Sequence, residues 1–343
     1  MRSLARKFIN EWTREDFEAH LQDITGHDKS VQKIMIAGDG NMNFTLRLIF
    51  DDQSSIIVKQ SPPYCARFPE IPAPGNRIIS EIKFYQLLEE GPFLARHSPK
   101  LLGLDKTNKI AYLSDLGMAT DFEYLYNQTE KLNTETCEKL VRYLKKLHSL
   151  EISSDVTFEN LDMRALNHEY IFDLPFQDGE RAIDLNQVTG GLAEEVDHIL
   201  SETEIKIAAH ELGKLYFENT RTLIHGDFYP MSWIETTKGM FIIDPEFGFL
   251  GLPEIDLGFF LAHMLLSNNF AVAYNVINKT YGPCDYSLMA KFCAVEVIRR
   301  ISYVSQLPII NSLSFKKELL ISSAEVLKTG NIKVYEILSH HDH

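Results

Sequence analysis

The chain has 343 residues, of which 45% are hydrophobic and 24% are charged, and its formal net charge is −14. This length predicts two domains or one large two-lobed unit, with enough apolar residues for a sizeable core. The acidic balance argues against a nucleic-acid partner, since proteins that bind nucleic acid usually carry a basic surface.

The first third of the sequence predicts mostly strands. Residues 12–24 form a helical pattern, because apolar residues recur there at helical spacing behind a Thr. The stretch KIMIAGDGNMNFTLRLIF then predicts a strand, a Gly-rich turn and a second strand, and SIIVKQ predicts a third. An extended loop with five Pro, SPPYCARFPEIPAPG, precedes a helix over residues 77–90, and KIAYLSDL predicts a further strand.

Helical patterns dominate the remainder, over residues 134–150, 191–219, 259–266, 289–305 and 315–327. Between two of them lie two short β-like runs, TLIHGDFY and GMFIIDPEF, which are joined by a turn. We expect these two runs to pair. The whole pattern predicts an α+β fold, with a small strand-rich lobe over residues 1–116 and a larger, mainly helical lobe over residues 117–343.

Three carboxylates stand at the ends of these two runs. Asp227 ends the first run, and Asp244 and Glu246 end the second. If the runs pair, the carboxylates gather at one place, where they repel one another unless a cation joins them. Mg²⁺ suits a site with one or two protein carboxylates and open positions for phosphate oxygens. A neighbouring Asp that holds no metal can accept the proton of a hydroxyl group.

The strand-rich lobe supplies the other groups that phosphoryl transfer needs. The glycines of GDGNMNF, Gly38 and Gly40, let backbone N–H groups approach an anion closely. Lys59 is flanked by apolar residues in IIVKQ, and a buried Lys needs a negative partner, for which Glu81 on the following helix is the candidate. A Gly-rich cover, a phosphate-holding Lys, Mg²⁺ carboxylates and an Asp that orients a hydroxyl together move the γ-phosphoryl group of ATP.

Each of these parts also has a plain structural interpretation, as an edge Lys, an ordinary hairpin turn or a helix-capping DPE. Their order along the chain favours the functional interpretation. A Gly-rich turn, a strand Lys, a helix Glu, a connecting segment, HGD and an acidic pair follow one another as they do in kinases.

This arrangement resembles the aminoglycoside phosphotransferase and choline kinase superfamily, which has a two-lobed protein-kinase-like fold, and within it the 5-methylthioribose kinase family. The likeness lies in GDGNMNF, IIVKQSPPY, LIHGD with Ser232 five residues after Asp227, IDPEFGFLGLPEIDLG, and EVIRR near the end of the chain. The resemblance implies a kinase that uses ATP and Mg²⁺ to phosphorylate a sugar hydroxyl, with 5-methylthioribose of methionine salvage as the favoured acceptor.

The resemblance also implies roles for individual residues. Asp227 would be the catalytic base or orienter of the hydroxyl, and the metal ligands would be Asp244, Glu246 and Ser232. The residues that would lie against the nucleotide are Gly38, Gly40, Asn41, Lys59, Glu81, Ser114, Asp115 and Leu116. Those that would contact the acceptor are Asp227, Tyr229, Arg299 and Arg300.

The adjacent Arg299 and Arg300 are expected to divide their roles. Because neighbouring residues of a helix point in different directions, one Arg would reach the site and the other would pair structurally, with Glu296 as a candidate partner. The sequence leaves open which of the two does which. A site lined by Arg argues against a cationic acceptor and favours a neutral sugar.

Two features of the chain differ from the 5-methylthioribose kinase pattern. Where that family typically carries a Trp-Pro pair after the lysine strand, this chain has PEIPAPG over residues 69–75. The loop after HGD is also more aromatic, with Phe228 and Tyr229. Two alternatives therefore remain: a kinase of another hydroxyl acceptor, such as an aminoglycoside, a choline-like amino alcohol or a different sugar, and a catalytically inactive kinase-like binding module.

The cysteines and apolar segments indicate the cellular setting. The four Cys are scattered without a CxxC pair, which predicts free thiols in a reducing compartment. No apolar run is long enough to cross a bilayer, and the first residues lack the apolar core of a signal peptide. We therefore expect a cytoplasmic protein with no membrane partner, and the resemblance adds the expectation of a homodimer.

Overall fold

The structure, a computed structural model, describes residues 7–38, 40–127, 130–179, 181–304, 307, 309 and 312–338. The chain divides into two compact units. The first consists of Met1–Thr120 with Ile234–Gly248, and the second consists of Asp121–Trp233 with Phe249–His343. Residues 234–248 thus belong to the first unit, although most of the second unit precedes them in the sequence.

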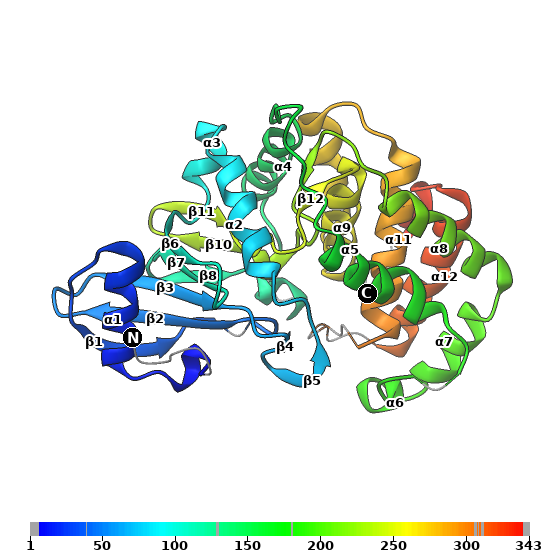
Figure 1. Cartoon of the computed structure of the whole chain (residues 1–343). Helices are drawn as coiled ribbons and strands as arrows, with labels where there is room; N and C mark the ends of the chain where they lie inside the picture. Colours follow the sequence, from blue (N-terminus) through cyan, green and yellow to red (C-terminus); the bar gives the residue numbers. More distant parts are fainter. Residues whose placement is uncertain are drawn as a thin grey trace. The chain divides into compact units, whose positions relative to one another are not determined.

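A five-stranded antiparallel sheet forms the centre of the first unit (Figure 1). In spatial order its strands are β1 (Val31–Ile36), β2 (Phe44–Phe50), β3 (Ser55–Gln60), β7 (Ile110–Ser114) and β6 (Leu101–Asp105). Strand β2 buries alternate residues, as expected when one face of a sheet meets a core. Lys59 of β3 lies between Thr45 on β2 and Ala111 on β7.

Helix α1 (Arg14–Thr25) packs on this sheet. Thr13 begins the helix in a capping box with Asp16, and Gly26 ends it in the left-handed conformation. The apolar residues of the helix and of the segment before it share one core with the strands. That core contains Ile9, Trp12, Phe17, Leu21, Val31, Leu46, Leu48, Phe50, Ile56, Val58, Ile110 and Tyr112.

Shorter elements complete the first unit. Strands β4 (Tyr64–Cys65) and β5 (Phe68–Pro72) form a hairpin within the Pro-rich stretch, which was predicted as an extended loop. Helices α2 (Arg77–Leu88) and α3 (Pro92–Arg96) follow. A separate sheet has the order β11 (Gly239–Ile242), β10 (Trp233–Thr236) and β8 (Ala119–Asp121). Asp244 and Glu246 come directly after β11.

The second unit is mainly helical (Figure 1). Its helices include α4 (Thr134–His148), α5 (Leu161–His168), α6 (Leu185–Val188), α7 (Leu192–Leu200), α8 (Thr203–Tyr216), α9 (Pro253–Leu266), α10 (Phe270–Val276), α11 (Tyr286–Ser302), α12 (Leu313–Thr329) and α13 (Lys333–Leu338). Two short strands, β9 (Leu223–Ile224) and β12 (Phe249–Leu250), pair with each other.

Helices α9 and α11 form the buried centre of this unit. All residues of α9 from Glu254 onward are buried. A Cβ atom at Gly258 would come within 2.8 Å of the backbone of Met289 and Cys293, so glycine permits the close approach of the two helices. Consequently His263 of α9 and Glu296 of α11 are in hydrogen-bond contact.

The α+β prediction is confirmed, but one predicted strand pairing is wrong. The run that contains Leu223 does not pair with the run that contains Met240; β9 pairs with β12, and β11 pairs with β10. The physical reason is that β9 ends after Ile224. The backbone N–H groups of the next two residues, His225 and Gly226, donate to the Asp256 carboxylate instead of to a neighbouring strand. The single helix predicted over residues 191–219 is divided into α7 and α8.

Two predictions about the whole chain can be compared with the structure. Cys65, Cys137, Cys284 and Cys293 all carry free thiols, as predicted. Within the described ranges, no helix combines the length and the apolar character that a membrane crossing requires.

Candidate active site

The Gly-rich turn between β1 and β2 is open on its outer side. Gly38 has a φ of +79°, in the left-handed region that favours glycine, and no atom lies within 4 Å of a Cβ placed at Gly38 or Gly40. Asn41 accepts hydrogen bonds from Arg67 of the neighbouring hairpin, at its backbone oxygen (3.0 Å) and at Oδ1 (3.3 Å). The turn is therefore supported from behind and accessible to a ligand. Asp39 lies outside the described residues.

Lys59 is a buried ammonium group between two carboxylates. Its Nζ donates to both carboxylate oxygens of Glu81 at 2.8 Å and to Oδ1 of Asp244 at 2.5 Å. Burial disfavours the charge, but the carboxylates of Asp244, Glu81 and Glu246 raise the pKa of Lys59 above its ordinary value. The predicted pairing of Lys59 with Glu81 is confirmed, and Lys59 is a fixed positive charge in the first unit.

Asp244 has an unusual backbone conformation. Its φ is +60°, a left-handed conformation that costs a non-glycine residue about 1 kcal/mol or more. Its backbone N–H donates to the hydroxyl of Tyr85 at 3.3 Å, and its side chain is 46% exposed. Such strain is often found at functional sites. In Asp244 the strained backbone carries a carboxylate that contacts Lys59, and about half of this side chain is exposed to solvent.

Glu246 is held on the other side of this cluster by Asn43 and Arg77. Asn43 Nδ2 donates to Glu246 at 2.8 Å, and the Arg77 guanidinium lies 3.7 Å from the same carboxylate oxygen. The fully buried Arg77 also donates to Asn43 Oδ1 and to backbone oxygens of the Gly-rich turn, of the Pro-rich hairpin and of the residues that flank this hairpin. One guanidinium thus joins the turn, the hairpin and Glu246.

Burial raises the pKa of Glu246 to about 7, even though Lys59 and Arg77 oppose the shift. A carboxylate with a raised folded-state pKa stabilises the protein at low pH and loses that contribution as pH rises through 7. With EDTA present to remove divalent cations, we therefore expect the Tm of Glu246→Gln to rise relative to the Tm of the unmodified protein as pH increases from 5 to 8. Thermal denaturation across this range measures the effect.

The exposed Glu90 of the same unit provides the control for this pH series. The Tm of Glu90→Gln should follow that of the unmodified protein at every pH. A Tm difference between Glu246→Gln and the unmodified protein that stays constant from pH 5 to 8 would contradict the raised pKa.

The predicted adenine-facing segment 114–116 ends the strand-rich region. Ser114 exchanges two hydrogen bonds with the backbone of Lys100. The Asp115 carboxylate is turned toward the sheet, where it accepts from Arg47 Nη2 (3.0 Å), Ser55 Oγ (2.7 Å) and its own segment's Gly117 N–H (2.8 Å). Burial alone would raise the pKa of Asp115, but these donors lower it. The Asp115 side chain is therefore engaged within the protein, and Leu116 beside it is half-buried.

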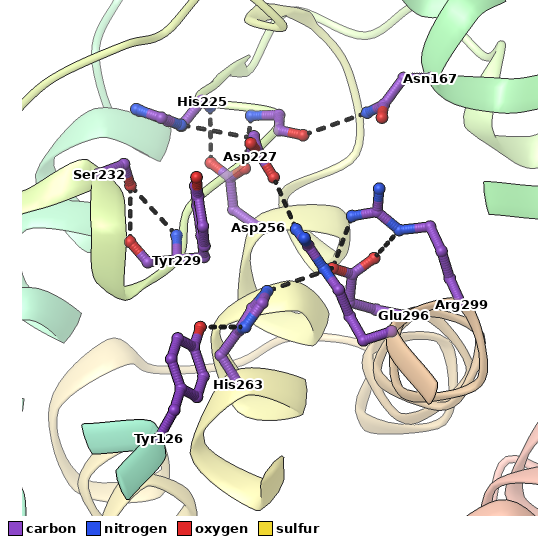
Figure 2. Close-up of polar contacts among 12 residues, drawn as sticks. Tyr126, Asn167, His225, Asp227, Tyr229, Ser232, Asp256, His263, Glu296 and Arg299 are labelled. Atoms are coloured by element: carbon purple, nitrogen blue, oxygen red, sulfur yellow. Dashed lines mark hydrogen bonds and ion pairs between the residues drawn. The ribbon is translucent and has the colours of Figure 1, made fainter. Parts of the chain in front are cut away.

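In the second unit, Asp256 of α9 fixes the HGD loop. Asp256 accepts from the backbone N–H groups of His225 (2.7 Å) and Gly226 (2.8 Å), and from His148 Nε2 (3.0 Å), and Figure 2 shows the two backbone contacts. Gly226 adopts a φ of +79°. The loop that presents Asp227 is thus hydrogen-bonded to a buried carboxylate at its backbone.

Asp227 lies next to the guanidinium of Arg300. The separation between Arg300 Nη2 and Asp227 Oδ1 is 3.5 Å, and the Asp227 side chain keeps 23% of its surface exposed. Burial raises the pKa of Asp227, whereas Arg300 and Arg299 oppose this shift. The arrangement gives a carboxylate with one fixed cationic neighbour and an open side, which is suited to accept a proton from a hydroxyl group.

Ser232 and Tyr229 shape the same loop. Ser232 Oγ donates to the backbone oxygen of Tyr229 (2.8 Å) and accepts from its N–H (3.1 Å), as Figure 2 shows. The Tyr229 ring lies against two side chains: its centroid is 5.2 Å from the Arg300 guanidinium and 5.3 Å from the His263 ring. Ser232 therefore closes the loop, and its role as a metal ligand stays a prediction.

The expectation that only one of Arg299 and Arg300 pairs with Glu296 is wrong, although one of them, Arg300, does reach Asp227 as expected. Both donate to Glu296, Arg299 through Nε (2.8 Å) and Nη2 (2.7 Å) and Arg300 through Nε (2.6 Å). Positions i+3 and i+4 lie on the same helix face, and long flexible side chains can converge there on one carboxylate. Arg300 is the one whose contact with Asp227 places it beside the HGD loop.

Sequence reasoning missed several residues of these two clusters. The missed residues are Asn43, Arg77, Tyr126, His148, Asp256 and His263. Asn43 and Asp256 stand inside the quoted motifs GDGNMNF and EIDLG, so their motif positions could have indicated them. The others carry no local signal, because contacts that hold these clusters together join residues far apart in the sequence.

Metal binding by protein groups alone is not evident. Among the residues that the structure describes, no group of three or more His, Cys, Asp and Glu side chains is arranged to hold a metal ion. The first unit contains Asp244 and Glu246, and the second contains Asp227. The prediction that all three surround one ion stays a prediction. A Mg²⁺ site here would take most ligands from phosphate oxygens and water, as Mg²⁺ often does.

Comparison with known proteins gives a family match and a set of relatives. A model of the phosphotransferase enzyme family matches residues 46–286. A methylthioribose kinase of Bacillus cereus is 26% identical over 241 residues, which cover 67% of this chain and 59% of that protein. The corresponding enzyme of Exiguobacterium sibiricum is 27% identical over 242 residues, with 67% and 60% covered. The chain therefore spans about three fifths of the length of these relatives.

Solved structures share the fold at low identity. Spectinomycin phosphotransferase APH(9)-Ia, in complex with ADP and spectinomycin, superimposes with a TM-score of 0.54 at 14% identity, over 92% of this chain and 98% of that one. Choline kinase LicA from Streptococcus pneumoniae gives 0.51 at 13% identity, over 92% and 96%. The predicted protein-kinase-like fold is thereby confirmed.

Proposed function

From the premise that the chain belongs to the phosphotransferase enzyme family, we propose that it is an ATP-dependent kinase of a small-molecule hydroxyl group, with 5-methylthioribose as its favoured acceptor. One observation carries the proposal furthest. Lys59 is held between Glu81 and Asp244 in the first unit, as a phosphate-binding Lys requires. The second unit adds Asp227, a carboxylate with an open side.

The first unit is assigned the nucleotide and the metal. Gly38, Gly40 and Asn41 would lie against the phosphates, Lys59 would neutralise them, and residues 114–116 would face the adenine. Asp244 and Glu246 fit Mg²⁺ because both are hard oxygen ligands, and because the buried Glu246 carboxylate lacks the full charge compensation that a cation gives. Ser232, a residue of the second unit, is the third proposed ligand. When bound, Mg²⁺ would neutralise charge on the transferring phosphoryl group.

The second unit is assigned the acceptor. Asp227 would accept the proton of the acceptor hydroxyl, whose oxygen forms the new P–O bond to the γ-phosphorus as the bond to ADP breaks. Arg300 opposes the rise in the pKa of Asp227 that burial causes, and it would lie beside the acceptor with Tyr229. Arg299 stands behind it and holds Glu296. No covalent intermediate is needed.

The identity of the acceptor is supported by two arguments. The relatives that cover two thirds of this chain are named methylthioribose kinases. In addition, a guanidinium lies next to Asp227, and a positive group beside the base disfavours a cationic acceptor such as choline or an aminoglycoside. The alternative of a different sugar is favoured by the stretch PEIPAPG, which takes the place of a Trp-Pro pair and begins within β5.

The test is a measurement of ADP release with Mg²⁺, ATP and a panel of acceptors: 5-methylthioribose, other pentoses, choline and kanamycin. We expect turnover with 5-methylthioribose to exceed that with the cationic compounds. Turnover with another compound alone would reassign the acceptor. A complete lack of turnover, together with no rise in Tm on adding Mg²⁺ and ATP, would favour an inactive module instead.

A further inference from the structure

Three histidines in the described chain make the same pair of hydrogen bonds. In each, Nδ1 lies 2.7 Å from a tyrosine hydroxyl, and Nε2 lies 3.0 to 3.2 Å from a carboxylate oxygen. These triads are Tyr112–His20–Asp105, Tyr281–His148–Asp256 and Tyr126–His263–Glu296. In the His263 triad Nε2 faces an acceptor and carries the proton, so Nδ1 of the neutral ring accepts from the Tyr126 O–H.

The triad of His263 is linked to Asp227 through Glu296 and Arg300 (Figure 2). His263 Nε2 donates to Glu296 Oε1, the same oxygen to which Arg300 donates through Nε at 2.6 Å. The other end of that guanidinium, Nη2, faces Asp227 at 3.5 Å. Arg300 therefore bridges two carboxylates, and its direction depends on where the Glu296 carboxylate is held.

The charges in this network require His263 to be neutral. Burial lowers the pKa of His263 to about 4, and burial likewise raises the pKa of Tyr126 well above its ordinary value. Burial would raise the pKa of Glu296 too, but Arg299 and Arg300 hold it well below its ordinary range. Two guanidiniums thus balance two carboxylates, Glu296 and Asp227, and His263 adds a directional donor without adding charge.

We propose that His263, oriented by Tyr126, is a positioning residue for Asp227: its Nε2–H fixes the Glu296 carboxylate so that Arg300 stays directed at Asp227. The proposal deepens the proposed function and rests on it for the role of Asp227 as the base. Without this donor, Glu296 is free to turn toward Arg299, which already binds it through two nitrogens, and Arg300 loses its anchor.

Loss of the Arg300 contact would leave Asp227 with burial as the dominant influence, and its pKa would rise further. The ionisable groups that surround Asp227 are Arg299, Arg300 and Glu296 of α11, His225 of its own loop, Tyr216 of α8 and Tyr126. Arg299 also donates to the Glu296 oxygen that His263 contacts, but Arg300 is the guanidinium that links this oxygen to Asp227. The effect of replacing His263 is therefore predicted to be specific.

The first measurement follows the protonation of the Asp227 carboxyl group by NMR and does not depend on enzyme activity. In protein labelled with ¹³C at aspartate carboxyl carbons, the Asp227 signal is assigned by its loss in Asp227→Asn. We expect His263→Leu to raise the titration midpoint of Asp227 by about one pH unit, the size of a lost neighbouring charge. His263→Gln, which keeps an N–H donor, should restore much of the original value, and Tyr126→Phe should give a smaller shift.

The matched control is His20→Leu, which removes the equivalent histidine from the triad of the first unit. This variant should lose stability but leave the Asp227 midpoint unchanged. An unchanged midpoint in both His263→Leu and Tyr126→Phe, or an equal shift in His20→Leu, would overturn the proposal. If His263→Leu does not fold, the Gln and Phe variants decide the question.

The second measurement is the pH profile of kcat/KM with whichever acceptor turns over. His263→Leu should lower kcat/KM about tenfold or more near neutral pH, as misplacement of a reacting group does, and move the acid limb upward. An acid limb that stays in place would overturn the proposal. If no acceptor turns over, the kinase proposal fails, while the titration above still decides whether His263 positions Asp227.

Discussion

Replacing Asp227 with Asn is expected to lower kcat by about 10² to 10⁴-fold, the range that general-base catalysis contributes. The amide has nearly the same shape as the carboxylate but cannot accept the hydroxyl proton. Because the nucleotide is assigned to the other unit, the affinity for Mg²⁺ and ATP should change little. The measurements are ADP release with the acceptor, and nucleotide binding by isothermal titration calorimetry.

Stability gives this variant a second signature. The raised pKa of Asp227 means that the folded protein disfavours its charge, so its stabilising contribution is lost as pH rises. Asp227→Asn should therefore have a Tm at pH 8 that equals or exceeds that of the unmodified protein. Asp197→Asn, which removes an exposed partner of Arg181, serves as the control and should leave kcat intact. Unchanged turnover in Asp227→Asn would remove Asp227 from its role.

Replacing Lys59 with Met is expected to abolish nucleotide binding and also to destabilise the protein by about 3 to 5 kcal/mol, the effect of removing one partner from a buried ion pair. Glu81 has no exposed surface, and Lys59 donates to both of its carboxylate oxygens. Without Lys59 this charge stays buried and uncompensated. Urea denaturation measures the loss of stability, and calorimetry measures the loss of nucleotide affinity.

A second substitution separates the two effects. The double variant Lys59→Met/Glu81→Gln should recover a large part of the stability, since it no longer buries an unpaired charge, but it should not recover nucleotide binding. Lys29→Met removes an exposed ion pair with Asp52 and should change stability far less than Lys59→Met does. A double variant as unstable as Lys59→Met would show that the Lys59–Glu81 pair is not the source of the loss.

The parts of the structure that local sequence patterns govern could be predicted. Strand β3 coincides with SIIVKQ, and the helix that carries Glu81 begins at the predicted residue, so the Lys59–Glu81 pair followed from two adjacent elements. The hydrophobic periodicity of these segments depends on neighbours within one turn or one strand. The order of the motifs then gave the fold class, which the solved structures confirm.

The rest depended on long-range contacts that no local pattern encodes. The partners of β9 and β11 were predicted wrongly because residues 223–224 and 239–242 look equally strand-like, and a distant carboxylate, Asp256, ends the first of them. The contact of His263 with Glu296 depends on the close packing of α9 against α11 at Gly258, which no local pattern shows. Helical periodicity predicts which face of a helix is buried, but it does not predict which residues of another helix pack against that face.

The assignment of residues 234–248 to the first unit has a consequence for the order in which the chain matures on the ribosome. A nascent chain that ends at residue 120 holds Lys59 and Glu81 but lacks Asp244, Glu246 and strands β10 and β11. The amino-terminal unit therefore cannot be completed until residues 234–248 have emerged as well, and the usual N-to-C succession of domain folding is interrupted. A truncated gene encoding residues 1–120 would yield an unfinished first unit.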